Sequence, residues 1–269
     1  MIDTMKQFFV TVSLLSIMLL NQAMAEEPDT ATQEDDIEQE AMASLMRMAT
    51  FLSGAQQLSV TIDAGHDAVQ RWGQKIEFGA VRHVTIRRPD RVRVDVVNRD
   101  GSQSGVRFNS KEISVFSVDD KVYATDLKPG SADSAMEHLV EKLEIGLPLR
   151  ELFSSELPKL LKERVTGANV VGTETLGGVR CEHLALRSTE LDAQIWIDKD
   201  GHPLPRRIVL TYWHVKGEPQ FWANFSDWNL SAKVPDSLFE YTPPPDSERI
   251  PFVPRKSPSD TNSSNGETP

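Results

Sequence analysis

Residues 75–98 read KIEFGAVRHVTIRRPDRVRVDVVN, two segments of alternating character on either side of an Arg88-Pro89-Asp90 turn. Apolar side chains occupy even-numbered positions in both segments, among them Ile76 and Ile86 before the turn and Val92 and Val94 after it. Successive side chains of a β-strand point to opposite faces of the sheet. The period of two therefore predicts a pair of strands that share one buried face.

The same alternation continues on both sides of this stretch. It begins at Leu58, Val60 and Ile62, and it returns repeatedly toward the C-terminus. The connections are too short for the long crossovers that parallel strands require, so the pattern predicts an antiparallel meander. The further segments of this kind are 106–108, 113–118, 121–125, 170–175, 179–186, 191–197, 208–212 and 221–225.

Two segments have helical spacing instead, and Leu152-Phe153 and residues 157–161 are expected to form short helical pieces. The first begins near Asp35 or Asp36, either of which can cap a helix, and ends at Gly54. The second covers residues 131–144. A long antiparallel sheet with helices segregated on one face is an α+β fold. The apolar stripe of the first helix consists of Ile37, Ala41, Leu45, Met48 and Leu52, widened by Met42, Met46 and Phe51.

The N-terminus has the organisation of a secretory signal peptide. Lys6 precedes an apolar run from Phe8 to Leu20, and Ala23-Met24-Ala25 supplies a cleavage motif. The run is shorter than the roughly 20 residues that a membrane-spanning helix needs. We therefore expect residues 1–25 to be removed and the mature chain to work in the periplasm. Since no cysteine follows the signal, we expect no lipid anchor.

Composition divides the mature chain into three parts. Residues 26–35 are polar and acidic and predict a flexible lead-in, and residues 36–253 carry the periodic segments of one domain. Residues 254–269 have almost no apolar side chains and predict a disordered tail. No internal repeat is found.

The charge and cysteine content narrow the class of partner. The net charge of −11 disfavours nucleic acid, whose phosphates repel an acidic protein. Cys181 is the only cysteine, so no intramolecular disulfide can form and we expect a buried, inert thiol. We expect a monomer. The charge does not exclude transient contact of this monomer with a membrane.

The sequence contains no motif that indicates catalysis. A nucleophile elbow, a paired-histidine zinc helix, a phosphate-binding glycine loop and paired C-x-x-C motifs are all absent. Cys181 and His183 could face the same way on one strand, but a zinc site would need further ligands. We therefore expect no enzyme, no cofactor and no metal.

Five arginines lie within twelve residues, at positions 82, 87, 88, 91 and 93. Arg91 and Arg93 have the parity opposite to Val92 and Val94, so we expect them to face water. Arg82 shares the apolar parity. Either a bulge near Gly79 shifts the register, or Arg82 points to the apolar side and needs an anionic partner, such as a ligand head group at a cavity mouth.

Six short segments stand out by their order along the chain. They are Arg88-Pro89-Asp90-Arg91-Val92-Arg93, Val122-Tyr123-Ala124-Thr125, Ile145-Gly146-Leu147-Pro148-Leu149, Gln194-Ile195-Trp196-Ile197, Pro203-Leu204-Pro205-Arg206-Arg207 and Phe239-Glu240-Tyr241-Thr242-Pro243-Pro244. In this order they resemble a family of predicted periplasmic proteins catalogued only as a domain of unknown function. More distantly, the chain is similar to the LolA lipoprotein carriers. That resemblance implies an incomplete antiparallel barrel, a single curved sheet whose concave face is covered by helices, with an apolar cavity for acyl chains.

Two functional hypotheses follow. The first is a soluble periplasmic carrier of an apolar or acylated ligand, for which Phe78→Glu should abolish uptake in a folded protein. The second is an envelope protein-interaction module without a bound small ligand, with Trp213 and Trp222 as its first candidate surface. For the carrier, the expected ligand-binding residues are Leu45, Met48, Val60, Ile62, Phe78, Arg82, Val84, Ile86, Val94 and Phe108.

Overall fold

A computed structural model of the chain describes residues 30–142, 149–231 and 233–252, with side chains from residue 39 onward. The predicted signal peptide and the C-terminal tail lie outside these residues. The helices are α1 (Thr30–Gly54), α2 (Ala132–Glu141) and α3 (Leu157–Arg164), with short 3₁₀ helices η1 (Arg150–Phe153) and η2 (Asp236–Phe239). The strands are β1 (Gln57–Val69), β2 (Lys75–Arg87), β3 (Arg91–Asn98), β4 (Gln103–Phe108), β5 (Glu112–Ser117), β6 (Val122–Leu127), β7 (Val165–Leu176), β8 (Val179–Ser188), β9 (Asp192–Asp198), β10 (Pro205–Thr211), β11 (Gln220–Asn229) and β12 (Glu248–Arg249).

All strands of the described residues belong to one sheet, in the order β12-β6-β5-β4-β3-β2-β1-β11-β10-β9-β8-β7. Two sequential meanders, β1 to β6 and β7 to β11, meet where β1 pairs with β11. Every neighbouring pair is antiparallel except the two-residue pairing of β12 with β6. The sheet is not closed into a barrel, because β7 and β12 lie at its two edges. The predicted α+β fold with a single antiparallel sheet is confirmed.

The apolar parity of the strands turns toward the helices. Leu58, Val60 and Ile62 of β1 are buried, and they pack with helix residues in one core. We call this side the inner face and the opposite side the outer face. β1 pairs with β2 without interruption from Gln57↔Arg87 to Val69↔Lys75. No bulge near Gly79 therefore shifts the register, and Arg82 shares the inner face with Val84.

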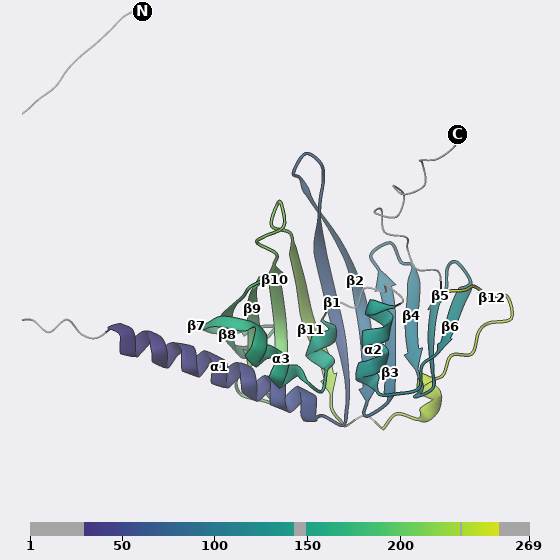
Figure 1. Cartoon of the computed structure of the whole chain (residues 1–269), viewed down its shortest axis with the longest axis horizontal. Coiled ribbons are helices and arrows are strands. Elements are labelled where there is room, and N and C mark those ends of the chain that lie inside the picture. The colour runs from purple at the N-terminus through teal and green to yellow at the C-terminus, as the bar shows by residue number, and fades with distance from the viewer. Residues whose placement is uncertain (1–29, 143–148, 232, 253–269) are drawn as a thin grey trace, which may run out of the picture.

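The helices cover the inner face, with α1 at the β7 end and α2 against the first meander (Figure 1). α1 ends at Gly54 as predicted, but it begins at Thr30, about one and a half turns before the expected start at Asp35 or Asp36. Residues 30–35 are therefore helical, although they were expected to belong to a flexible lead-in. α2 begins after Ser131, whose hydroxyl accepts a hydrogen bond from the Ser134 amide. This is the capping geometry that stabilises the first turn of a helix.

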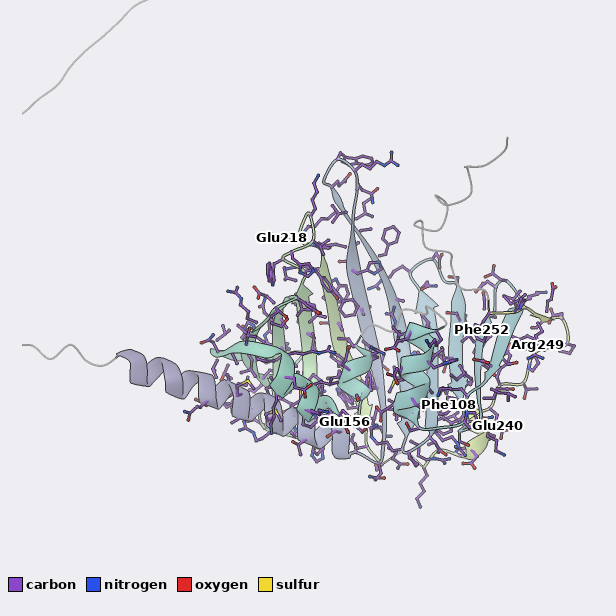
Figure 2. The ribbon with its side chains drawn as sticks, viewed as in Figure 1. Phe108, Glu156, Glu218, Glu240, Arg249 and Phe252 are labelled. Carbon is purple, nitrogen blue, oxygen red and sulfur yellow. The ribbon has the colours of Figure 1, made fainter. Side chains whose placement is uncertain are left out.

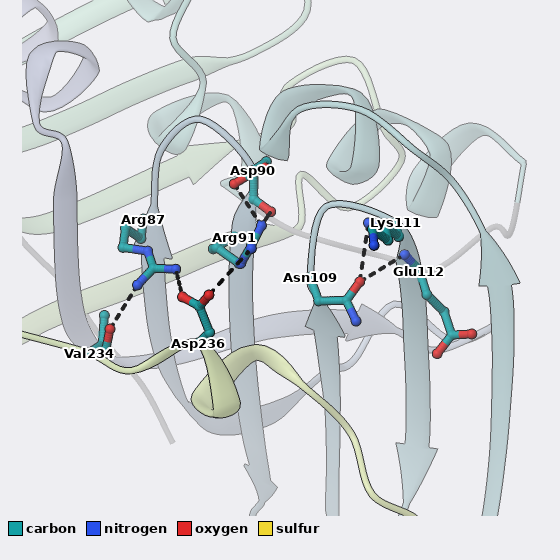
Figure 3. A network of polar contacts seen from close by, with 8 residues as sticks. All are labelled: Arg87, Asp90, Arg91, Asn109, Lys111, Glu112, Val234 and Asp236. Atoms are coloured by element: carbon teal, nitrogen blue, oxygen red, sulfur yellow. Dashed lines mark hydrogen bonds and ion pairs between the residues drawn. The ribbon is translucent and has the colours of Figure 1, made fainter.

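The outer face of the first meander is covered by the C-terminal segment 236–252. Phe239 of this segment is fully buried, and Tyr241 stacks on Phe116 of β5 with ring centroids 4.4 Å apart. Asp236 forms ion pairs with both Arg87 and Arg91 (Figure 3).

This cover corrects the expectation that Arg91 and Arg93 face water. Their side chains are only 17% and 29% exposed. Arg91 lies beneath Asp236, and Arg93 donates to Asp95 at 2.6 Å. The alternation predicted the correct face of the strand, but it could not indicate that a distant segment crosses that face.

The hairpin of β1 and β2 extends beyond the rest of the sheet (Figure 1). Trp72, near its tip, is 74% exposed. The loop between β10 and β11, which carries Glu218, lies beside it (Figure 2), and Lys75 donates a hydrogen bond to the Glu218 carbonyl at 2.8 Å. Strand pairing therefore continues past the region that the helices cover.

Candidate functional site: two apolar cavities beneath the helices

Two cavities lie between the helices and the inner face in the described part of the chain. We name them after the helix that covers each: the α3 cavity beneath the second meander and the α2 cavity beneath the first. Their volumes are about 210 Å³ and about 220 Å³. Both have predominantly apolar walls, which is typical of ligand sites in proteins.

The α3 cavity is lined mainly by aliphatic side chains. Of its charged residues, Arg164 lies 3.4 Å from Glu151 and Arg187 pairs with Asp192 at 2.8 Å, and Glu190 also lines the cavity. The aliphatic walls are Leu45 and Met48 of α1, Leu152 of η1, Leu157, Leu160 and Leu161 of α3, and Leu186, Ala193, Ile195, Ile208 and Leu210 of the sheet.

The α2 cavity has similar walls but a different charge. Met136 and Leu139 of α2 and Phe153 of η1 form its cover. Arg82 of β2 and Arg150 of η1 also line it, and its lining residues in the described structure include no carboxylate. The sheet contributes Ile62, Val84, Ile86, Val92, Val94, Val96, Ser104, Gly105, Val106 and Val115.

η1 stands between the two cavities. Leu149, which precedes it in a left-handed conformation with φ of 66°, lines the α3 cavity together with Leu152. Phe153 lines the α2 cavity instead. The four-residue helix is therefore a shared wall, and the separation of the cavities depends on its position.

Arg88 fixes that wall to the rest of the fold. Its Nη2 donates to the carbonyl oxygen of Phe153 at 2.8 Å, and its Nε donates to the carbonyl oxygen of Ala55, just after α1, at 3.1 Å. Burial lowers the pKa of Arg88, and the nearby Asp133 carboxylate partly opposes this. One guanidinium thus joins the end of α1, the start of the β2–β3 turn and η1.

The expected ligand-binding residues fall into three groups. Leu45 and Met48 line the α3 cavity. Val60 and Phe108 are 3% and 0% exposed in the packed core and line neither cavity. Those that line the α2 cavity are Ile62, Arg82, Val84, Ile86 and Val94.

Phe78 belongs to none of these groups, because it lines neither cavity. It has the inner-face parity but is 53% exposed, and it stacks on His66 in the projecting hairpin. Parity indicates the face of a strand; it does not indicate whether a helix covers that part of the face.

The ligand-binding residues expected from the sequence include none from η1 or α3, and none from the strands that line the α3 cavity. Leu186, Ile195 and Ile208 alternate as clearly as the chosen residues of the first meander. Their alternation was a usable signal. What it lacked was the pairing of β1 with β11, which places both meanders under the same set of helices.

Trp213 and Trp222, the candidate surface of the interaction hypothesis, lie in different environments. Trp213 is 47% exposed. Trp222 lies on the outer face over Gly65, and its Nε1 donates to Glu77 at 3.0 Å. Trp213 is thus half exposed, whereas Trp222 is a packed and hydrogen-bonded residue.

Cys181 is buried, as predicted, and burial raises the pKa of its thiol. His183 stacks on Trp196 and has both ring nitrogens in hydrogen bonds, with Glu174 and Gln194. Across the residues described, no three His, Cys, Asp or Glu side chains come together in a way that could hold a metal ion. None of the described helices has the length and apolar character needed to cross a membrane.

Comparison with solved structures gives matches at low sequence identity. The lipoprotein LppX from Mycobacterium tuberculosis is 18% identical with a TM-score of 0.44, covering 73% of this chain and 99% of that one. LprF from Mycobacterium bovis is 13% identical with a TM-score of 0.47, covering 73% and 96%. A LolA superfamily protein from Nitrosomonas europaea is 12% identical with a TM-score of 0.38, covering 75% and 97%.

No curated protein matches the sequence. A family profile, in contrast, matches residues 41–253, which include the sheet, α2, α3 and the buried part of α1. This range contains both cavities. The chain therefore belongs to the family described as predicted periplasmic protein, DUF2092.

Proposed function

We propose that this protein is a soluble periplasmic carrier that binds an apolar or acylated ligand in the two inner-face cavities. The observation that carries the proposal is the pair of aliphatic cavities beneath one layer of helices. The export signal at residues 1–25 and the family description support the compartment. The mature chain would be released from its signal and would carry no lipid anchor.

The cavity walls favour acyl chains over polar ligands. Apolar surface in contact with water costs roughly 25 cal/mol per Å². Leucine, isoleucine and valine side chains dominate both cavities, and they offer an alkyl chain dispersion contacts without any requirement for hydrogen bonds. Filling the cavities with hydrocarbon therefore stabilises the fold.

The arrangement of the cavities suits a flexible ligand. Each is smaller than the roughly 300 Å³ at which sites for compact drug-sized molecules begin. They are separated by η1, a four-residue helix held through Arg88. A small displacement of η1 would join them into one slot, which can accept an acyl chain longer than either cavity.

Cavity-filling variants test the proposal. Ile208→Trp fills the α3 cavity and Val94→Trp fills the α2 cavity, while Val97→Trp places the same ring on the outer face, where Val97 is 37% exposed. Delipidated protein is titrated with a fluorescent 16-carbon fatty acid. We expect at least one cavity variant to weaken binding about tenfold or more while Val97→Trp leaves it unchanged. Equal affinity for the fatty acid in the wild type and in all three folded variants would contradict the proposal.

The interaction module remains the second candidate because one observation favours it. Trp72, Phe78 and Trp213 are about half exposed or more on the adjoining hairpins. Exposed aromatic groups of this kind are typical of surfaces that contact another molecule. If the fatty acid does not bind, truncation of these three side chains and a search for a protein partner become the next experiment.

A further inference from the structure

Arg82 lies in the middle of an apolar wall. Its backbone pairs with Ile62 on one side and Val96 on the other, and all three residues line the α2 cavity. In the described structure, its hydrogen bonding is limited to the carbonyl of Ala80 in its own strand, at 3.4 Å. No carboxylate of the described residues lies within 4.0 Å of it. Burial lowers its pKa, as it does for any cation taken from water.

The fold does supply partners to other arginines of the first meander. Arg107, only 8% exposed on the outer face, is bound to the carboxylate of Asp95 and to two backbone carbonyls. Arg93 shares Asp95, and Arg99 pairs with Asp63 at 2.7 Å. Because a half-buried charge is costly without a partner, the contrast between Arg82 and Arg107 requires an explanation.

A second guanidinium lines the same cavity. Arg150 of η1 lies 3.7 Å from the carboxylate of Glu151, its neighbour in the chain, and makes no other ion pair with the described residues. Glu151 itself lines the α3 cavity and lies closer to Arg164. In the described residues, the α2 cavity therefore has two cationic side chains and no anionic one, in a protein with 40 acidic and only 29 basic residues.

We propose that the α2 cavity is an anionic head-group site, in which a phosphate or carboxylate of an amphiphile is held between Arg82 and Arg150. The acyl chain of the same ligand lies against Val84, Val94 and Val106. The hydroxyl of Ser104, which also lines the cavity, is available as a further donor. This inference rests on the proposed carrier function and defines its ligand as an acidic amphiphile.

The chemistry of the cavity supports that class of ligand. Guanidinium groups bind phosphate and carboxylate through paired N–H donors, and such charge-assisted bonds are stronger where water is excluded. A neutral lipid would bury Arg82 without a partner, whereas a free inorganic anion would leave the aliphatic wall exposed. An acidic amphiphile satisfies both parts of the site.

The first test compares ligands that differ only in the head group. Delipidated protein is titrated, below the micelle concentrations, with 1-palmitoylglycerol 3-phosphate, palmitate and uncharged 1-palmitoylglycerol. We expect at least one anionic ligand to bind about tenfold more tightly than the neutral one, the difference expected for one charged hydrogen bond. The preferred anion identifies phosphate or carboxylate as the head group.

Variants locate the preference. Arg82→Gln should reduce the preference for the anionic ligand to within about threefold, without weakening the binding of 1-palmitoylglycerol. Arg150→Gln should reduce this preference in part. Arg99→Gln, which removes an outer-face guanidinium paired with Asp63, should leave it unchanged. Equal binding of charged and neutral ligands, or a preference that survives both cavity variants, overturns the head-group site but leaves the carrier function standing. Binding of none of the three ligands overturns the carrier function itself.

A second test needs no ligand. If Arg82 has no partner, Arg82→Gln should raise the melting temperature of the delipidated protein, because it removes an unpaired cation from an apolar wall. Arg107→Gln should lower the melting temperature, since Asp95 and two carbonyls lose a buried donor. A fall in melting temperature for Arg82→Gln would show that this side chain already has a partner within the chain, and would overturn the inference.

Discussion

Leu152 and Phe153 are consecutive residues of η1, yet their side chains line different cavities, Leu152 the α3 cavity and Phe153 the α2 cavity. The short 3₁₀ helix between α2 and α3 is therefore the common wall of both sites. Its two apolar side chains, 6% and 5% exposed, link the packing of one cavity to that of the other.

Phe153→Ala should remove the α2 side of this wall. We expect the free energy of unfolding of the delipidated protein to fall by about 3–5 kcal/mol, the usual effect of truncating a buried phenylalanine. Bound acyl ligand should restore part of this loss by filling the enlarged cavity. Urea unfolding with and without palmitate measures both effects, and Phe78→Ala, which truncates an exposed ring, is the matched control. Equal unfolding midpoints for the two variants would show that Phe153 does not support the wall.

Arg88→Met should release η1. The variant removes charged donors from the carbonyls of Ala55 and Phe153, so we expect a loss of about 2–3 kcal/mol in unfolding free energy. Amide hydrogen exchange should accelerate in residues 150–153 before the rest of the fold. Arg99→Met, which breaks an exposed ion pair, should cost about 1 kcal/mol or less. Exchange in η1 that matches the control would mean that Arg88 does not hold this segment.

Asp198 should make the fold sensitive to acid. Burial, the largest effect, raises the pKa of this carboxyl, but hydrogen bonds from Arg206 and the Gly201 amide outweigh it and lower the pKa below the ordinary 3.8. The stabilisation is therefore present above pH 3.8 and is lost as the pH falls through the lower folded-state pKa. Asp198→Asn should cost about 2 kcal/mol at pH 7. The melting temperatures of the variant and the wild type should converge once the pH has fallen below the folded-state pKa of Asp198, which lies below 3.8. A constant difference at all pH values would contradict this linkage.

Gly65→Ala should strain the pairing of β1 with β11, where the two meanders meet. A Cβ at Gly65 would lie 2.8 Å from the indole ring of Trp222, in the β1–β11 pair. We expect a loss of about 1–3 kcal/mol, measured by urea unfolding, because the rigid ring has to move. In the double variant, Trp222→Leu should remove most of the loss in unfolding free energy that Gly65→Ala causes. Gly167→Ala, whose Cβ would meet Arg187 at 3.6 Å, is the control, and an equal loss there would exclude the contact with Trp222 as the cause.

Phe78→Glu should leave ligand uptake intact. The sequence alone predicted the opposite result, but Phe78 lies on the projecting hairpin and lines neither cavity. Titration of the delipidated variant with the fluorescent fatty acid distinguishes the two expectations. Lost uptake in a folded Phe78→Glu protein would place the ligand at the hairpin instead of beneath the helices.

The positions of Arg82 and Phe78 in the structure show how far the sequence could predict this site. Alternation gave both residues the apolar parity, because strand geometry fixes parity, but for Arg82 it left open a bulge near Gly79, which the uninterrupted pairing of β1 with β2 excludes. It could not determine that β2 continues past the helices, so that one residue is enclosed and the other exposed. The same limit applies to Arg91, which the C-terminal segment covers through Asp236.

Local patterns predicted the strands, α2 and the end of α1 because each depends on nearby residues. The pairing of β1 with β11 and the placement of η1 depend on contacts between segments far apart in the chain. No periodicity in the sequence records such contacts. The α3 cavity was consequently missed, although Leu186 and Ile208 carry the same apolar pattern as Val84 and Val94.

Native mass spectrometry of protein purified from the periplasm without detergent tests the carrier function most directly. We expect a stoichiometric extra mass that extracts into organic solvent as an acylated, acidic molecule. That mass should be retained by Val97→Trp and Phe78→Glu and reduced in Val94→Trp and Ile208→Trp. A clean protein mass, unchanged after incubation with envelope lipids, would contradict the carrier function.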